Sequence, residues 1–141
     1  MGQYLLFTDG SCIGNPGPGG WAYLLKILGK PGFQQQDSGH EKDTTNSRME
    51  LRAIVEGLKV IPDGSTVEIY TDSTMAIQVS TSKNPKLKNR DLVDGMRHQL
   101  SRVTCYFSHV KAHNGHTENE FVDKLAFGAA QGKIGIGVAR R

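Results

Sequence analysis

The chain has 141 residues, of which 37% are hydrophobic and 22% are charged, and its formal net charge is +3. This length and composition fit one compact domain, and no apolar run approaches the roughly 20 residues of a membrane-spanning helix. The two cysteines, Cys12 and Cys105, form no spacing motif, so we expect reduced thiols in a cytoplasmic protein. The net charge is too small to indicate a nucleic-acid partner by itself, although basic residues are concentrated between Lys83 and Arg102.

Hydrophobic patterning and turn signals divide the first half of the chain into five elements. They are strands over residues 3–8, 21–28 and 33–41, a helix over 47–61 and a strand over 66–71. A glycine-rich loop over 10–20 separates the first two strands, and the tight turn 29–32 predicts a hairpin.

The second half alternates helices with one strand. It predicts a short helix over 73–79, a linker over 80–88, a helix over 89–102, a strand over 103–108 and a helix over 117–131. The tail 132–141 alternates branched apolar residues with glycine, and we expect it to dock on the sheet edge. This order indicates an α/β or α+β fold with a mixed sheet, because the hairpin at the start argues against a fully parallel, doubly wound sheet.

Two of the predicted strands, 3–8 and 66–71, end in the same way. Each runs into a Thr-Asp pair that is followed within two residues by serine. If these strands are parallel neighbours, Asp9 and Asp72 emerge at one edge of the sheet, where α/β proteins place their functional sites. The alternative interpretation is structural, with Asp9 as a turn residue and Asp72 as a helix N-cap.

Two further acids border the apolar stripes of helices. Glu50 ends the sequence Ser47-Arg48-Met49-Glu50, which fits a capping box, yet its position also allows it to face the sheet edge. Asp123 lies one turn into the last helix. Four acids at one spot raise one another's pKa at a cost in stability, which a divalent cation removes. Oxygen ligands without cysteine suit Mg²⁺ or Mn²⁺, and two such ions can activate water and stabilise the leaving oxygen in phosphodiester cleavage.

Five motifs follow one another along the chain. They are Thr8-Asp9-Gly10-Ser11 with Asn15-Pro16-Gly17-Pro18-Gly19-Gly20, then Thr44-Thr45-Asn46-Ser47-Arg48-Met49-Glu50-Leu51, Thr71-Asp72-Ser73, Val110-Lys111-Ala112-His113-Asn114-Gly115-His116, and Glu118-Asn119-Glu120 with Asp123. Together they resemble type 1 ribonuclease H from about Tyr4 to Ala130. Each motif alone is moderately specific, and five in this order are very specific.

The resemblance implies a five-stranded mixed sheet with helices on both faces and a single catalytic domain over 1–141. It implies endonucleolytic hydrolysis of the RNA strand of an RNA–DNA hybrid by a monomer, which leaves 5′-phosphate and 3′-hydroxyl ends. Two Mg²⁺ ions, or Mn²⁺ in their place, would be held by Asp9, Glu50, Asp72 and Asp123, with Asp9 bridging them. His113 would assist proton transfer or product release.

The resemblance also implies how the hybrid is read. In the family, the first loop and the next helix start lie in the minor groove against the RNA 2′-hydroxyl groups, which distinguish RNA from DNA. The residues carried over are Gly10, Ser11, Cys12, Asn15, Asn46, Ser47 and Met49. The pocket for a DNA phosphate is carried over to Thr45 and Asn89, with Arg48 as a further candidate.

The chain departs from many bacterial members, which insert a long basic helix and loop with tryptophans before the segment that starts here at Asn89. This chain has only residues 80–88 there, and its single tryptophan is Trp21. We therefore expect weaker hybrid binding than in those members, partly offset by Lys83, Lys86 and Lys88.

Other classes of protein fit the sequence less well. A zinc site of His109, His113 and His116 with a cysteine lacks any C-x-x-C pair, and the glycine-rich loop has neither the Gly-Lys-Ser/Thr end of a P-loop nor the helix that a Rossmann motif needs. A non-catalytic hybrid-binding module would lack a carboxylate. A transposase or integrase core shares metal-bound acids, but the residues for reading 2′-hydroxyl groups argue for RNA.

Overall fold

The computed structural model describes residues 2–32, 34–110 and 117–132. In chain order the elements are β1 (Gln3–Cys12), β2 (Gly17–Ile27), β3 (Gln35–Thr44), α1 (Asn46–Lys59), β4 (Thr66–Thr71), α2 (Thr74–Val79), α3 (Arg90–Leu100), β5 (Thr104–His109) and α4 (Thr117–Ala130). The predictions for His113 and for most of the C-terminal tail lie outside the described residues.

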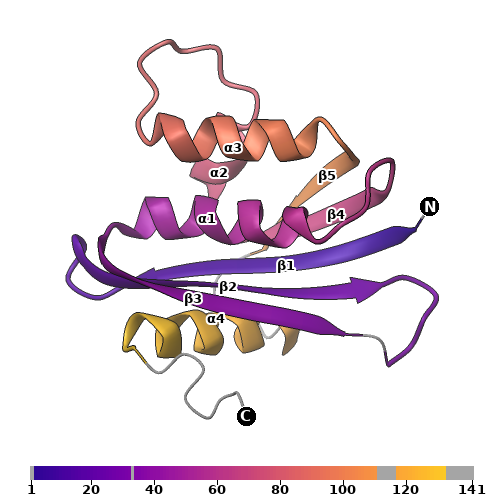
Figure 1. Cartoon of the computed structure of the whole chain (residues 1–141), viewed down its shortest axis with the longest axis horizontal. Helices are drawn as coiled ribbons and strands as arrows, with labels where there is room; N and C mark the ends of the chain where they lie inside the picture. Colours follow the sequence, from indigo (N-terminus) through magenta and orange to yellow (C-terminus); the bar gives the residue numbers. More distant parts are fainter. Residues whose placement is uncertain (1, 33, 111–116, 133–141) are drawn as a thin grey trace.

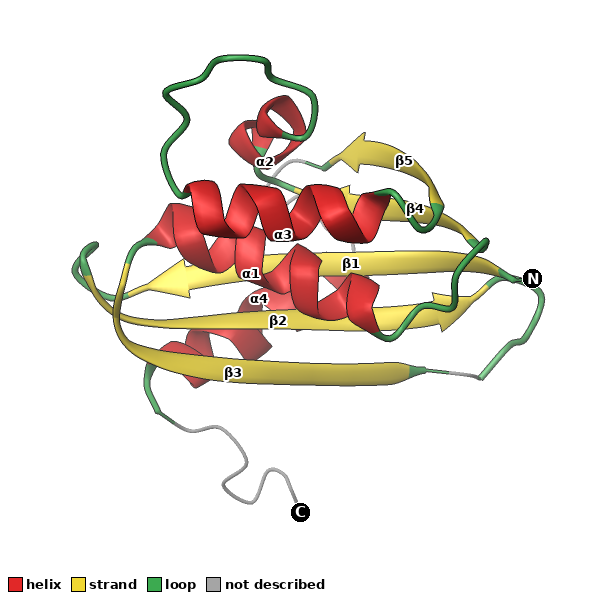
Figure 2. Cartoon of the chain, turned by 45° about the horizontal axis from the view of Figure 1, so that its top comes forward, coloured by secondary structure: helices red, strands yellow, loops and turns green. Residues whose placement is uncertain are grey.

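The strands form one mixed sheet in the order β3-β2-β1-β4-β5, with β1 at its centre (Figure 2). β1 pairs antiparallel with β2 and parallel with β4. α1, α2 and α3 lie on one face of the sheet, and α4 covers the other (Figure 1). The predicted five-stranded mixed sheet with helices on both faces is confirmed.

The connection from β1 to β2 differs from its prediction. A loop was expected over residues 10–20, but strands occupy most of this range. β1 continues to Cys12 and β2 begins at Gly17, with Ser11 paired to Gly20 and Cys12 to Gly19. Gly20 meets a packing need, since a Cβ there would lie 2.4 Å from backbone atoms of α4. Glycine at this position lets α4 rest directly on β2.

Apolar side chains fix the helices on the two faces of β1. The inner stripe of α1, with Leu51, Ile54 and Leu58, is buried in the larger core. On the other face, Val122 and Ala126 of α4 are buried in a second cluster with β1 and β2. Each buried aliphatic side chain contributes about 1.5–3 kcal/mol, so both helices are firmly placed beside the carboxyl end of β1. None of the helices in the described ranges combines the length and apolar character that a membrane crossing requires.

Candidate active site

Asp9 and Asp72 lie at the same edge of the sheet, on neighbouring parallel strands. The register pairs Phe7 with Tyr70, and each aspartate comes two residues after its member of this pair. Asp9 lies inside β1, paired with Ala22 of β2, so the turn interpretation is wrong. Ser73 caps α2 by accepting a hydrogen bond from the Ala76 N–H at 3.0 Å, so the N-cap interpretation of Asp72 is also wrong.

Glu50 has no capping role either. The N-cap of α1 is Thr45, whose Oγ1 accepts a hydrogen bond from the Arg48 N–H at 3.2 Å. The alternative interpretation of Glu50 as part of a capping box is therefore wrong, because α1 begins directly after β3 and Ser47 already lies in its first turn. A Cβ on Gly10 would lie 2.4 Å from the Glu50 nitrogen. This close approach of α1 to β1 brings Glu50 next to Asp9.

The three acids converge on one point. Asp9, Glu50 and Asp72 each offer a carboxylate oxygen, and these oxygens lie within 4.8 Å of one another. Asp9 and Glu50 are only 6% and 7% exposed. In the described part of the chain, this is the one group of three or more acids, histidines or cysteines arranged closely enough to hold a metal ion. Asp123 of α4 is not a member of this group, but it is near enough to raise the pKa of both Asp9 and Asp72.

The electrostatics of the cluster disfavour its own negative charge. Burial, followed by repulsion from Asp72 and interaction with Asp123, raises the pKa of Asp9 from 3.8 to about 8. Burial and repulsion from Asp9 raise the pKa of Glu50 well above its usual value, and burial and Asp123 raise the pKa of Asp72. Glu50 Oε1 is buried and has no hydrogen-bond partner among the described residues. A cationic ligand would offset the repulsion among these oxygens.

An open pocket adjoins the acids. Its volume is about 340 Å³, and its lining is Asn46, Ser47, Glu50, Asp72, Ser73, Thr74 and Met75. Asn46 and Ser47 were expected at the site from the sequence. The three residues after Asp72 were not, although their position directly behind an acid at a strand end was a usable signal.

The glycine-rich hairpin and the start of α1 are joined by direct contacts. Asn15 Oδ1 accepts a hydrogen bond from the Asn46 N–H at 2.9 Å, and the Cys12 thiol lies 3.5 Å from the Thr44 carbonyl oxygen. These segments thus form one surface beside Asp9. Met49 is an exception among the expected contact residues, because it is fully buried and has no surface to offer a substrate.

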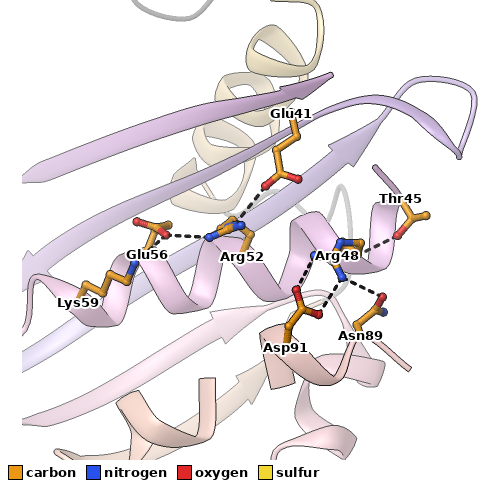
Figure 3. A network of polar contacts seen from close by, with 8 residues as sticks. All are labelled: Glu41, Thr45, Arg48, Arg52, Glu56, Lys59, Asn89 and Asp91. Atoms are coloured by element: carbon orange, nitrogen blue, oxygen red, sulfur yellow. Dashed lines mark hydrogen bonds and ion pairs between the residues drawn. The ribbon is translucent and has the colours of Figure 1, made fainter. Parts of the chain in front are cut away.

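The residues expected to bind a DNA phosphate lie at the starts of two helices, α1 and α3. Asn89, the N-cap residue of α3, has left-handed backbone angles (φ 57°, ψ 40°), and its side chain makes no cap hydrogen bond. Its Oδ1 instead accepts from Arg48 Nη1 at 3.5 Å, and the Arg48 N–H donates to the Thr45 hydroxyl group, so Arg48 links the two residues (Figure 3). Asp91 also binds Arg48. The sequence provides no signal for this contact, which joins residues 43 positions apart.

Comparison with known proteins agrees with this geometry. The sequence model described as RNase H matches residues 1–131. Ribonuclease H of Erythrobacter litoralis is 43% identical over 144 residues, which cover 92% of this chain and 97% of that protein. The crystal structure of a type 1 RNase H with the type 2 active-site motif superposes with a TM-score of 0.80 at 26% identity, covering 93% of this chain and 73% of that one. An RNase H1 solved in complex with an RNA/DNA hybrid has a TM-score of 0.71 at 21% identity over 92% of this chain and 97% of that one, a likeness of fold.

Fold, acid cluster and relatives define an enzyme of the hydrolase class, a nuclease. The chain belongs to the ribonuclease H family. The family and the enzyme class that the sequence motifs indicated are confirmed.

Proposed function

We propose that the chain is an endoribonuclease that hydrolyses the RNA strand of RNA–DNA hybrids and leaves 5′-phosphate and 3′-hydroxyl ends. The observation that carries this proposal is the convergence of Asp9, Glu50 and Asp72 from three separate elements. All three lie beside an open pocket or at a strand end, and neither Glu50 nor Asp72 supplies a helix cap. Family membership supports the same activity, since the relatives are named for it.

The acid cluster fits divalent cations of the hard type. All donor atoms are carboxylate oxygens, two of the acids are buried, and Glu50 Oε1 is without a partner in the described ranges. Asp9, Glu50, Asp72 and Asp123 would together hold two Mg²⁺ or Mn²⁺ ions. Such ions, when bound, make water a stronger nucleophile and stabilise the charge on the leaving oxygen. The raised pKa values mean that cation binding also displaces protons from the carboxyl groups.

The surface beside the acids supplies the choice of RNA. Gly10, Ser11, Cys12 and Asn15 of the first hairpin, with Asn46 and Ser47 of α1, would contact the 2′-hydroxyl groups in the minor groove. The Asn15–Asn46 hydrogen bond supports this assignment, because it holds the two segments in one fixed arrangement. Met49 would support this surface without contacting the substrate, because its buried side chain packs against Gly10 and Gly19.

Residues on either side of the acids would contact phosphates of the hybrid. Thr45 and Asn89 would bind a phosphate of the DNA strand. The exposed Lys83, Lys86 and Lys88 lie in the connection from α2 to α3. Arg97 holds the start of this connection by donating to the carbonyl oxygens of Val79, at the end of α2, and of Ser82. Changing the three lysines to alanine should weaken affinity for a long hybrid, as measured by fluorescence anisotropy. Unchanged affinity would remove them from the binding surface.

The decisive experiment offers three labelled duplexes with Mg²⁺: RNA–DNA hybrid, double-stranded RNA and double-stranded DNA. Wild-type protein should cut only the RNA of the hybrid, and Asp9→Asn should be inactive. Cleavage of all three duplexes, or full activity of Asp9→Asn, would contradict the proposal. His113→Ala should slow turnover without abolishing it.

Two further properties stay predictions, namely a monomeric state and a cytoplasmic location. Light scattering on purified protein tests the first, since the site as assembled here uses residues of one chain only.

A further inference from the structure

The guanidinium group of Arg48 contacts Asn89, one of the residues proposed to bind a phosphate, and both of its terminal nitrogens already donate hydrogen bonds to Asp91 (Figure 3). Nη1 donates to Asp91 Oδ1 at 3.0 Å and Nη2 donates to Asp91 Oδ2 at 2.8 Å. This parallel pair of hydrogen bonds is the geometry that arginine uses for a phosphate as well as for a carboxylate. Asp91 thus occupies the part of Arg48 that a phosphate would use.

The two partners are held unequally. The Arg48 side chain is 29% exposed and that of Asp91 is 65% exposed. Arg48 is also tied at its backbone to the Thr45 cap and at Nη1 to Asn89. Asp91 is at the solvated start of α3, where its carboxylate can turn into water at little cost. The hydrogen bonds from Arg48 lower the pKa of Asp91 to about 2, so it is an anion throughout the neutral range.

We propose that Asp91 competes with the substrate for Arg48 and thereby sets the affinity for the hybrid. The inference rests on the proposed function. A phosphate of the nucleic acid has to displace the carboxylate from the guanidinium group, and it then remains close to a displaced negative charge. Asp91 holds the Arg48 side chain in place in the free protein, but it lowers the affinity of Arg48 for a phosphate of the hybrid.

The chain contains a matched control for this idea. Asp94 is on the same helix and forms an ion pair with Arg90, with 3.1 Å between Arg90 Nε and Asp94 Oδ1. Its side chain is 59% exposed, close to the value for Asp91. Asp94→Asn therefore removes the same charge from the same helix without releasing Arg48.

The experiment measures binding of a labelled RNA–DNA hybrid over a range of salt concentrations. Asp9→Asn serves as the parent protein, so that the hybrid stays uncut. Adding Asp91→Asn should tighten the Kd at low salt by roughly threefold to tenfold, since the phosphate no longer has to displace an anion from Arg48. The slope of log affinity against log salt should change by less than about 0.9, the increment for one phosphate contact, because Arg48 meets the phosphate in both proteins. Asp94→Asn should change the Kd by less than about twofold and leave the slope as it was.

A third variant separates competition from a general charge effect. When Arg48→Gln is already present, Asp91→Asn should no longer tighten binding. Weaker binding by Asp91→Asn would overturn the inference and make Asp91 a positioning residue, and an equal gain from Asp94→Asn would overturn it as well. Thermal unfolding of each variant checks that it is folded.

The outcome for the proposed function is read separately, from the cleavage assay on the wild type. Hybrid-specific cleavage without tighter binding by Asp91→Asn contradicts the role of Asp91 alone. Failure of every variant to bind the hybrid contradicts both.

Discussion

Two glutamates on α1 occupy opposite electrostatic environments. Glu56, on the outer face, accepts hydrogen bonds from Arg52 at 3.4 Å and from Lys59 at 3.2 Å (Figure 3). Glu50 is buried on the inner face, where the groups that shift its pKa most, after burial itself, are the acids Asp9 and Asp72. A folded protein of modest stability retains such an arrangement when function requires it. The difference teaches that a buried acid surrounded by other acids is a better guide to a functional site than an acid paired with cations on the surface.

The largest effect expected from this comparison is on activity. Glu50→Gln should lower the rate of hybrid cleavage by at least roughly 100-fold, because even changes behind a metal ligand cost 10- to 100-fold. Glu56→Gln, on the same helix, should leave the rate within about twofold of wild type. Initial rates on a labelled hybrid with saturating Mg²⁺ measure both. Equal rates for the two variants would break the comparison.

The inner face of α1 also depends on a close backbone approach. Gly10→Ala should destabilise the protein by about 3 kcal/mol, since the added methyl group would meet the backbone of Met49 and Glu50 at 2.4–2.5 Å. Gly95→Ala in α3 is the control, because its Cβ would meet only Val55 at 3.9 Å. That change should be neutral or stabilising, as alanine favours a helix by about 1 kcal/mol. Urea unfolding midpoints distinguish them, and similar values for both would mean that α1 can move away from β1.

The acid cluster predicts a pH dependence of stability in the metal-free protein. The folded-state pKa of Asp9 is raised to about 8 from 3.8. The folded state therefore retains a proton that the unfolded chain releases, so stability is greatest below about pH 4 for this group and falls as the pH rises toward 8. Asp9→Asn should weaken this dependence, although the raised pKa values of Glu50 and Asp72 leave part of it. It should raise the unfolding free energy at pH 8 by several kcal/mol, at about 1.4 kcal/mol for each unit of pKa shift. Unfolding in EDTA across this range measures the effect, and identical curves for both proteins would contradict it. Adding Mg²⁺ at pH 8 should stabilise the wild type more than the variant.

The smallest effect belongs to the outer face of α1. Glu56→Gln should lower the unfolding free energy by only about 0.5 kcal/mol, and less at high salt, because its ion pairs are partly exposed and screened. Thermal unfolding at low and high salt measures this. A loss of several kcal/mol would show that the outer network contributes far more than surface pairs usually do.

Much of the site could be predicted because it follows from local patterns. Asp9 and Asp72 each come at the end of a strand with the same Thr-Asp sequence, and parallel pairing places both at one edge. The apolar spacing in α1 identified its buried face, and β4 has the bounds that its composition predicts. These features depend on side-chain periodicity, which is visible in the sequence.

The features that were predicted wrongly or not at all depend on backbone geometry and on contacts between residues far apart in the sequence. The S-x-x-E pattern at Ser47 resembles a capping box, but the start of α1 is set by the end of β3 and by Thr45. Glycines from 10 to 20 suggested a loop, yet backbone pairing between strands does not need β-branched side chains. The Arg48–Asp91 contact joins two helices that only the folded chain brings together.

The central place of β1 has a consequence for synthesis on the ribosome. Asp9 leaves the ribosome before Glu50 and Asp72, and Asp123 emerges later still, with α4. Domains form as their segments emerge from the N-terminus onward, so this group of acids is completed only after α4 has been synthesised. A chain that has not yet reached α4 thus lacks one of the four acids proposed to bind metal ions.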